Sequence, residues 1–182
     1  MMKLQLLDPI EWTGITQSID DEFGEEVSKA LLGDLTPIAL TDRGIRTIYL
    51  IPVTWMSVVL EEVPAGFDFH LVGKQLGVMT KDRFRLSLQI LPELLKLTTK
   101  VLVVSHKGAE AFTYGRSILK ESIVWCDSEL KRGQRVLVVN EENDCLGIAA
   151  LSTDAGRINR LSRDSLVGKN LVDIGWFIRR LG

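Results

Sequence analysis

The sequence predicts an α+β protein in two parts: an N-terminal mixed α/β domain with helices on a small antiparallel sheet, followed by a small C-terminal β-barrel. Apolar residues recur with helical and strand periods in the first half, whereas the second half holds short β-type runs separated by turn residues. The composition, 46% hydrophobic and 25% charged, is that of an ordinary folded protein. The expected domains are residues 1–97 and residues 98–182.

A long amphipathic helix is expected first. Apolar side chains recur at every fourth position, at Ile15, Ile19, Phe23, Val27 and Leu31. This spacing places them on one helical face, and a glycine at position 33 stands where a helix commonly ends. The sequence therefore predicts a helix over residues 11–32.

The rest of the N-terminal half is expected to alternate short strands and helices. The β-branched and aromatic residues of Thr47–Ile51 predict a strand, and Pro52 suits the first turn of a helix over Val53–Glu62. The other expected elements are a turn at Pro64–Gly66, strands at Phe69–Val72, Leu76–Met79 and Phe84–Ile90, and a helical turn from Pro92.

The second half is expected to be mostly β. One short helix is predicted, over Ala109–Tyr114. The predicted strands are Lys100–Val104, Ser122–Trp125, Val136–Asn140 and Leu146–Leu151. Short strands at this spacing, with turn glycines between them, are typical of a sandwich or a barrel.

Charge is distributed unevenly along the chain. Residues 1–97 hold 9 Lys/Arg and 14 Asp/Glu, a balance of −5, whereas residues 98–182 hold 13 and 10, a balance of +3. Positive charge thus collects in the second half, as a phosphate-binding module needs. The acidic N-terminal half is better suited to protein contacts, because its field repels RNA.

Motifs of catalysis are absent from the sequence, which has no nucleotide-binding loop and no nucleophile elbow. Ser105 and His106 are adjacent, and neighbours on a strand point to opposite sides, so they are not expected to form a catalytic pair. Cys126 and Cys145 are too few for a disulfide framework or a zinc site. We therefore expect no catalytic residue, no metal and no cofactor.

Membrane insertion is not expected either. The longest uncharged stretch, Thr47–Leu60, is too short to span a bilayer and contains a proline. The N-terminus lacks an apolar run of signal-peptide length. The sequence thus predicts a cytoplasmic protein.

One segment resembles a known domain. Val104–Lys120, VSHKGAEAFTYGRSILK, leads through a glycine into a short helix and then to a second glycine and an apolar pair. It resembles the opening of a PUA domain, a pseudo-barrel found in RNA-modifying enzymes and ribosome factors. Gly133–Ser152 resembles the long hairpin of that domain, and Asp173–Arg180 resembles its closing strand. The resemblance implies a C-terminal PUA-type β-barrel that binds RNA.

A narrower resemblance is to the Nip-seven family of ribosome-biogenesis factors, which carry an α/β domain before a PUA domain. KGAEAFTYGRSILK is similar to the family's GAE…F-x-YG…LK signature, and Gly77–Leu91 and the ending VDIGWFIR are also similar. This resemblance implies a non-catalytic factor of large-subunit ribosome biogenesis and pre-rRNA processing. It also implies uridine- or A/U-rich RNA as ligand, and other assembly or RNA-processing proteins as partners.

Three arginines at every third position are the main candidates for RNA contact. Arg157, Arg160 and Arg163 match the three positions of a basic pattern that archaeal members of that family use for RNA contact, although Gly156 stands where the family has a second arginine. Guanidinium groups at this spacing could bracket successive phosphates or stack on bases. The further candidates for RNA contact are Lys169, Lys107 and Lys120.

Other features of the second half leave alternatives open. The N-terminus of the short helix, around Gly108–Glu110, could offer free N–H groups to a phosphate, or Glu110 could cap it. Phe112 and Tyr114 could stack on a base, although a core position is expected for both. Trp125 and Trp176 are expected in strands and in the core.

Two other functions compete with ribosome assembly. One is an RNA-recognition subunit of an enzyme that modifies tRNA or rRNA. The other is a translation-factor-like protein that binds tRNA or the ribosome. Binding to precursor large-subunit particles would favour assembly, and binding to small subunits would favour translation.

Overall fold

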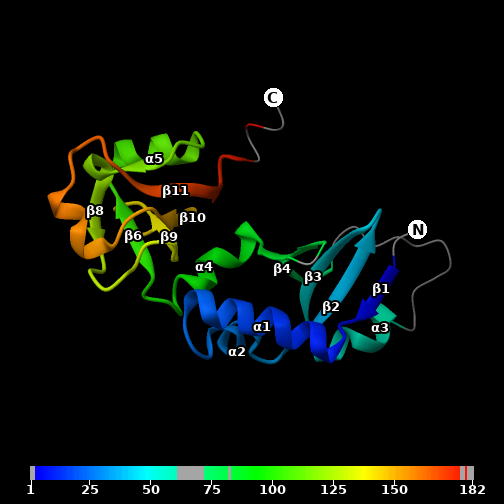
Figure 1. The fold of residues 1–182 in the computed structure, drawn as a ribbon. Helices are drawn as coiled ribbons and strands as arrows, with labels where there is room; N and C mark the ends of the chain where they lie inside the picture. Colours follow the sequence, from blue (N-terminus) through cyan, green and yellow to red (C-terminus); the bar gives the residue numbers. More distant parts are fainter. Residues whose placement is uncertain (1–2, 61–71, 82, 177–178, 180–182) are drawn as a thin grey trace. The chain divides into compact units, whose positions relative to one another are not determined.

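The computed structural model describes residues 3–60, 72–81, 83–176 and 179 (Figure 1). The chain divides into two compact units, residues 1–90 and residues 91–182. This division precedes helix α4 (Leu91–Leu94), which packs against strand β10 of the second unit, whereas the sequence placed the boundary after residue 97. Each unit has a sheet and a hydrophobic core of its own.

The first unit is built on a five-stranded sheet. Its strands are β1 (Lys3–Leu6), β2 (Leu35–Asp42), β3 (Ile45–Pro52), β4 (Lys74–Thr80) and β5 (Arg83–Leu86). They lie in chain order and every neighbouring pair is antiparallel. Alternate residues of β2 and β3 face one core, in which Ile38 and Ile51 are fully buried together with Val59. The small antiparallel sheet with helices is as predicted.

The single long helix predicted at the N-terminus is wrong, because two helices take its place. They are α1 (Pro9–Phe23) and α2 (Val27–Leu32). Gly24 ends α1 with φ +130°, a conformation outside the helical region that glycine adopts readily. The Asp20 carboxylate then accepts hydrogen bonds from the backbone N–H (2.7 Å) and hydroxyl (2.9 Å) of Ser28, so that α2 is tied back to α1.

The remaining elements of the first unit are short. They are the 3-10 helix η1 (Val53–Trp55), helix α3 (Met56–Leu60) and the 3-10 helix η2 (Leu88–Ile90). The predicted strand Phe84–Ile90 is too long, since β5 ends at Leu86 and Ile90 turns into the core. The predicted turn at Pro64–Gly66, the end of the predicted helix beyond residue 60 and the first residues of the predicted strand Phe69–Val72 lie outside the described residues.

The second unit contains a six-stranded, barrel-like sheet with the order β7-β11-β10-β9-β6-β8. Its strands are β6 (Val101–Val104), β7 (Ile118–Leu119), β8 (Ile123–Cys126), β9 (Arg135–Val139), β10 (Cys145–Leu151) and β11 (Leu166–Asp173). Only β6 and β9 pair in parallel among the described strands; the other pairs are antiparallel. Inward-facing Val, Leu and Ile residues from these strands form the core.

Three short helices lie in the connections between these strands. They are α5 (His106–Thr113), η3 (Lys120–Ser122) and η4 (Ala155–Arg160). Figure 1 shows α5 in green close to β11, and η4 as the orange connection between β10 and β11. The predicted closing strand Asp173–Arg180 is wrong at its start, because β11 ends at Asp173 and a turn follows it, and residues 177, 178 and 180 lie outside the described residues.

Candidate nucleic-acid interface

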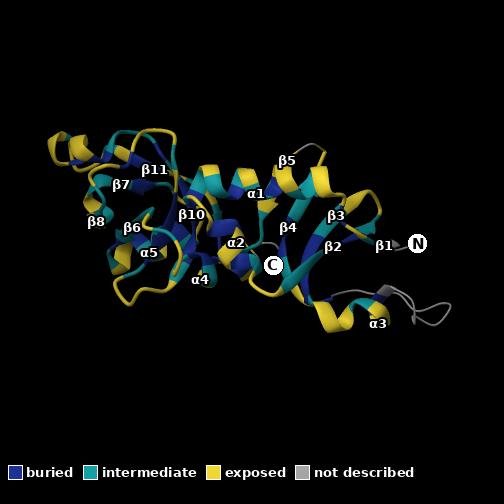
Figure 2. Cartoon of the chain, turned by 90° about the horizontal axis from the view of Figure 1, so that it is seen from below, coloured by how far each residue is buried: buried dark blue, intermediate teal, exposed yellow. Residues whose placement is uncertain are grey.

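The connection between β10 and β11 carries the predicted arginines. Ala155 and Ile158 of η4 bury their side chains in the core, which leaves Arg157 and Arg160 on the outside. Residues three apart in a 3-10 helix stand directly above one another, so both guanidinium groups project from the same edge. Arg163 follows the helix and is exposed as well. In Figure 2 the exposed residues of this connection appear in yellow.

The three arginines are only loosely held by the protein. Arg157 Nε lies 3.6 Å from Asp154 Oδ2, and Arg163 Nη2 lies 3.7 Å from Glu121 Oε2, with the arginine side chains 73% and 86% exposed. For Arg160, the described part of the chain supplies no hydrogen-bond or ion-pair partner. Exposed ion pairs of this kind contribute about 0–1 kcal/mol. All three side chains are therefore available to a phosphate at little cost.

Lys120 has a different environment from the other candidates. Its Nζ donates hydrogen bonds to the backbone oxygens of Asn159 (3.1 Å) and Leu161 (2.6 Å). These bonds use two of its three donors and fasten the end of η4 to the segment after β7. Lys120 therefore positions the arginines, and has one N–H left for a ligand.

The other two candidate lysines are exposed but are not joined to the arginines. Lys169 lies on β11 opposite Ala150, and Lys107 lies in the first turn of α5. No hydrogen bond or ion pair links either ammonium group to η4 within the described residues. Both remain separate candidates for phosphate contact.

Two further cations lie beside Arg157, and sequence reasoning missed them. Lys131 and Arg132 are exposed residues of the turn between β8 and β9, and the backbone N–H of Arg132 donates to Asp154 Oδ1 at 3.0 Å. This hydrogen bond, together with the positive charges of Arg157, Lys131 and Arg132, lowers the pKa of the Asp154 carboxyl. The sequence carries no signal of this cluster, because Lys131 and Arg132 are more than twenty positions away from Asp154 and Arg157.

The N-terminus of α5 is already occupied by groups of the protein itself. The Ser105 hydroxyl accepts the N–H of Gly108 at 3.3 Å, and the Glu141 carboxylate accepts the N–H of His106 at 3.2 Å. The helix begins at His106, earlier than predicted, so neither Gly108 nor Glu110 stands at its free end. The Glu141 carboxylate lies where a phosphate would bind, and this helix end is not a strong candidate for RNA contact.

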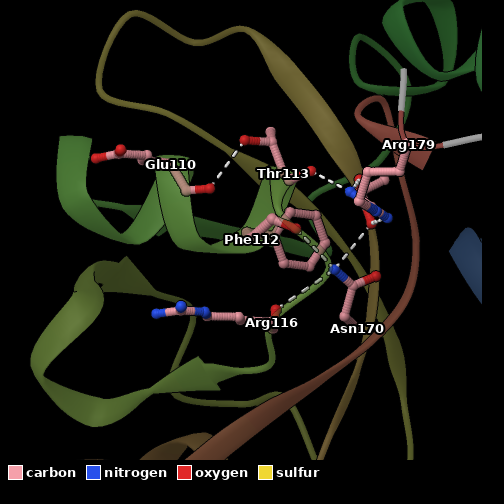
Figure 3. Close-up of polar contacts among 7 residues, drawn as sticks. Glu110, Phe112, Thr113, Arg116, Asn170 and Arg179 are labelled. Atoms are coloured by element: carbon pink, nitrogen blue, oxygen red, sulfur yellow. Dashed lines mark hydrogen bonds and ion pairs between the residues drawn. The ribbon is translucent and has the colours of Figure 1, made fainter. Parts of the chain in front are cut away.

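The C-terminus of α5 is held by a polar network that the sequence did not reveal (Figure 3). The buried Asp173 carboxylate forms two 2.9 Å hydrogen bonds with the guanidinium group of Arg179, which also donates to the Thr113 carbonyl oxygen. Asn170 Nδ2 donates to Asp173 Oδ2 (3.1 Å) and to the Phe112 carbonyl oxygen (2.9 Å). The segments Thr113–Gly115 (TYG) and Asp173–Gly175 (DIG) are thus connected by one polar network, which we call the joint.

The aromatic residues of this unit fall into two groups. Phe112 is fully buried, as expected of a core residue. Tyr114, Trp125 and Trp176 are 69%, 52% and 40% exposed, so their predicted core positions are wrong. Tyr114 ends α5 and Trp125 lies on the sheet's edge strand β8, where one side has no neighbouring strand. An exposed tyrosine next to Arg116 offers a surface for base stacking.

Other kinds of site find little support in the described residues. No group of three or more His, Cys, Asp or Glu residues is placed there to hold a metal ion. Both cysteines are free, and burial raises the pKa of each thiol to about 11, so both are protonated at neutral pH. None of the described helices is long and apolar enough to cross a membrane.

The fold defines the class of the chain: an α/β unit followed by a PUA-type barrel. Residues 100–182 match the family model of the UPF0113 PUA domain. A UPF0113 protein of Archaeoglobus fulgidus is 32% identical over 110 residues, which cover 60% of this chain and 62% of that protein. The alignment thus spans less than two thirds of the relative.

Solved structures agree with this fold. A hypothetical protein of Pyrococcus horikoshii aligns with a TM-score of 0.66 at 16% identity, covering 97% of this chain and 99% of the other. A conserved PUA domain protein of Thermoplasma acidophilum gives 0.62 at 12%, covering 99% and 100%. A PUA domain of Aeropyrum pernix, solved with tartrate, gives 0.62 at 15%, covering 100% and 91%. The predicted fold class is therefore confirmed, and the narrower Nip-seven resemblance stays a prediction.

Proposed function

We propose that this chain is a non-catalytic RNA-binding factor of large-subunit ribosome biogenesis, which binds precursor rRNA in the cytoplasm through its PUA domain. The observation that carries the proposal is the arginine edge, formed by Arg157 and Arg160 of η4 and by Arg163 just after it, whose exposed guanidinium groups are at most loosely paired. Guanidinium groups suit phosphate recognition because they present paired N–H donors. The role in ribosome assembly rests on the Nip-seven resemblance of KGAEAFTYGRSILK and VDIGWFIR.

The first prediction concerns RNA affinity. Replacing Arg157, Arg160 and Arg163 by alanine should weaken binding of a fluorescein-labelled 20-nucleotide oligouridine by about 10- to 100-fold at 0.1 M salt. The slope of log Kd against log salt should fall by about 2, because fewer counterions are released on binding when phosphate contacts are lost. Fluorescence anisotropy over a salt series measures both quantities.

A matched control separates local contact from total charge. Lys29, Arg83 and Arg85 are exposed residues of the first unit, and replacing them by alanine removes the same number of positive charges. This control should bind like the unchanged protein. We call the variant with alanine at positions 157, 160 and 163 the η4 variant. Equal affinity of the η4 variant and the unchanged protein would exclude the arginine edge as the RNA site.

The cellular role needs a separate measurement. We expect the protein to cosediment with precursors of the large ribosomal subunit, and the η4 variant to be depleted from those fractions. Cosedimentation with small subunits would instead favour a translation-factor role. A copurifying modifying enzyme or modified nucleoside would favour an RNA-recognition subunit.

A further inference from the structure

The turn after β8 and the connection after β10 are bonded side by side. The Gly133 N–H donates to the Leu151 carbonyl oxygen (2.8 Å), and the Leu151 N–H donates to that of Gln134 (2.9 Å). The Ala155 N–H donates to the Leu130 carbonyl oxygen (2.9 Å), in addition to the bond between Arg132 and Asp154. Residues 130–134 therefore have a fixed position next to the start of η4.

The local sequence explains why this turn presents its cations outward. Leu130 and Ala155 are buried in the core and anchor the two segments to it. Gly133 has φ +87°, which glycine adopts without strain, and the Lys131 N–H donates to Gln134 Oε1 at 2.7 Å. With these backbone groups fixed, the side chains of Lys131 and Arg132 are left in solvent.

Asp154 lies at the centre of this arrangement. Its carboxylate accepts the Arg132 backbone N–H at 3.0 Å and lies 3.6 Å from Arg157 Nε, and Lys131 precedes Arg132 in the turn. Asp127 and Glu129 lie in the same turn, but within the described residues neither Lys131 nor Arg132 has a side-chain ion pair. Arg160 ends η4 and Arg163 follows it, where Glu121 lies 3.7 Å from the Arg163 guanidinium and Asp164 is the next residue. Residues 154–164 hold three arginines and two aspartates, a balance of +1.

We propose that Lys131 and Arg132 form, together with Arg157, a second phosphate-contact patch that extends the arginine edge of η4 onto the neighbouring turn. The ligand would be the ribose-phosphate backbone of the same RNA chain, whose charges repeat along its length as these cations do along the surface. This inference rests on the proposed function and enlarges its site from one connection to two. Asp154 is a positioning residue, because it holds the Arg132 backbone and draws Arg157 towards it.

The test is the double variant Lys131→Ala/Arg132→Ala, measured with the same oligouridine. We expect Kd to rise about 5- to 20-fold at 0.1 M salt and the salt slope to fall by about 1 to 2. The control Arg83→Ala/Arg85→Ala removes two exposed cations from the first unit and should change neither quantity. Circular dichroism and thermal unfolding should be unchanged, since the bonds of this turn come from its backbone.

The two proposals fail in distinguishable ways. If the η4 variant loses binding while Lys131→Ala/Arg132→Ala keeps both affinity and salt slope, the second patch is refuted and the proposed function stands. If both variants bind like the unchanged protein, both proposals are refuted.

A second variant tests the part played by Asp154. Asp154→Asn keeps an oxygen acceptor for the Arg132 N–H but removes the only negative charge among the three cations. RNA should then bind about 2- to 5-fold more tightly, because one opposing charge near the phosphates is gone. Weaker binding of this variant would refute the placement of phosphate at this patch.

Discussion

Replacing Phe112 by alanine should lower the free energy of unfolding of the C-terminal unit by about 3–5 kcal/mol. Phe112 is fully buried in the core between α5 and the sheet, where it belongs to the same cluster as Val104, Ile118 and Val167. Truncation removes the transfer free energy of the ring and leaves a cavity that the neighbouring strands cannot fill. Helix α5 would also lose the side chain that seats it on the barrel.

The measurement has to report on the C-terminal unit alone, because the chain has two units. Hydrogen exchange of the β9 and β10 amides at increasing urea concentrations does so, since these strands are central in the sheet. Tyr114→Ala is the matched control: it removes an aromatic ring two positions away that is 69% exposed, and should cost less than about 1 kcal/mol. Equal losses for the two variants would contradict the assignment of Phe112 to the core.

Much of the second unit could be predicted from local sequence. The strands at β6, β9 and β10 were expected to within a residue at most ends, because β-branched and apolar residues fill them and turn residues bound them. Local pattern was enough there, since these strands lie in the interior of the sheet, where each has a neighbouring strand on both sides.

Local pattern failed where the environment is set by distant parts of the chain. Trp125 is a large apolar residue of the kind usually found in a core, but β8 is the edge of its sheet and the residue is 52% exposed. The helix predicted over residues 11–32 kept its apolar period through Gly24, and nothing in that period shows that the chain reverses there. Strand order and turn geometry, which decided both cases, are not encoded in a short window.

The candidate site divides in the same way. Arg157 and Arg160 were found because their spacing of three is itself a local signal, and a 3-10 helix turns that spacing into one edge. Lys131 and Arg132 were missed because their place beside Arg157 depends on the pairing of β9 with β10, which brings the two connections together. Lys120 could be singled out as basic, but not as a donor to two backbone oxygens.

The joint between α5 and the segment after β11 should also be sensitive to substitution. A methyl group at Gly175 would overlap the Thr113 carbonyl oxygen and approach both the Thr113 carbonyl carbon and Arg179 Nη1 to 3.0 Å. Backbone atoms cannot yield as a flexible side chain does, so the segment after β11 would have to move away from α5. We expect Gly175→Ala to lower the free energy of unfolding of this unit by about 2–3 kcal/mol.

The free energy of unfolding should fall because the hydrogen bonds of the joint depend on one another. Moving residue 175 separates the Arg179 guanidinium from the Thr113 carbonyl oxygen and strains its pair with Asp173, which is almost completely buried. A buried carboxylate that loses its partner is strongly destabilising. Asn170 can still donate to Asp173, so the carboxylate keeps one hydrogen bond and the unit should remain folded at room temperature.

The matched control for this prediction is Gly156→Ala. A methyl group at Gly156 would meet only the Ser128 carbonyl oxygen, at 3.5 Å, which is an ordinary contact. This variant should change the free energy of unfolding by less than about 0.5 kcal/mol. Hydrogen exchange of the α5 amides should increase in Gly175→Ala and stay unchanged in Gly156→Ala. Unchanged exchange in both variants would show that the TYG and DIG segments do not hold each other in place.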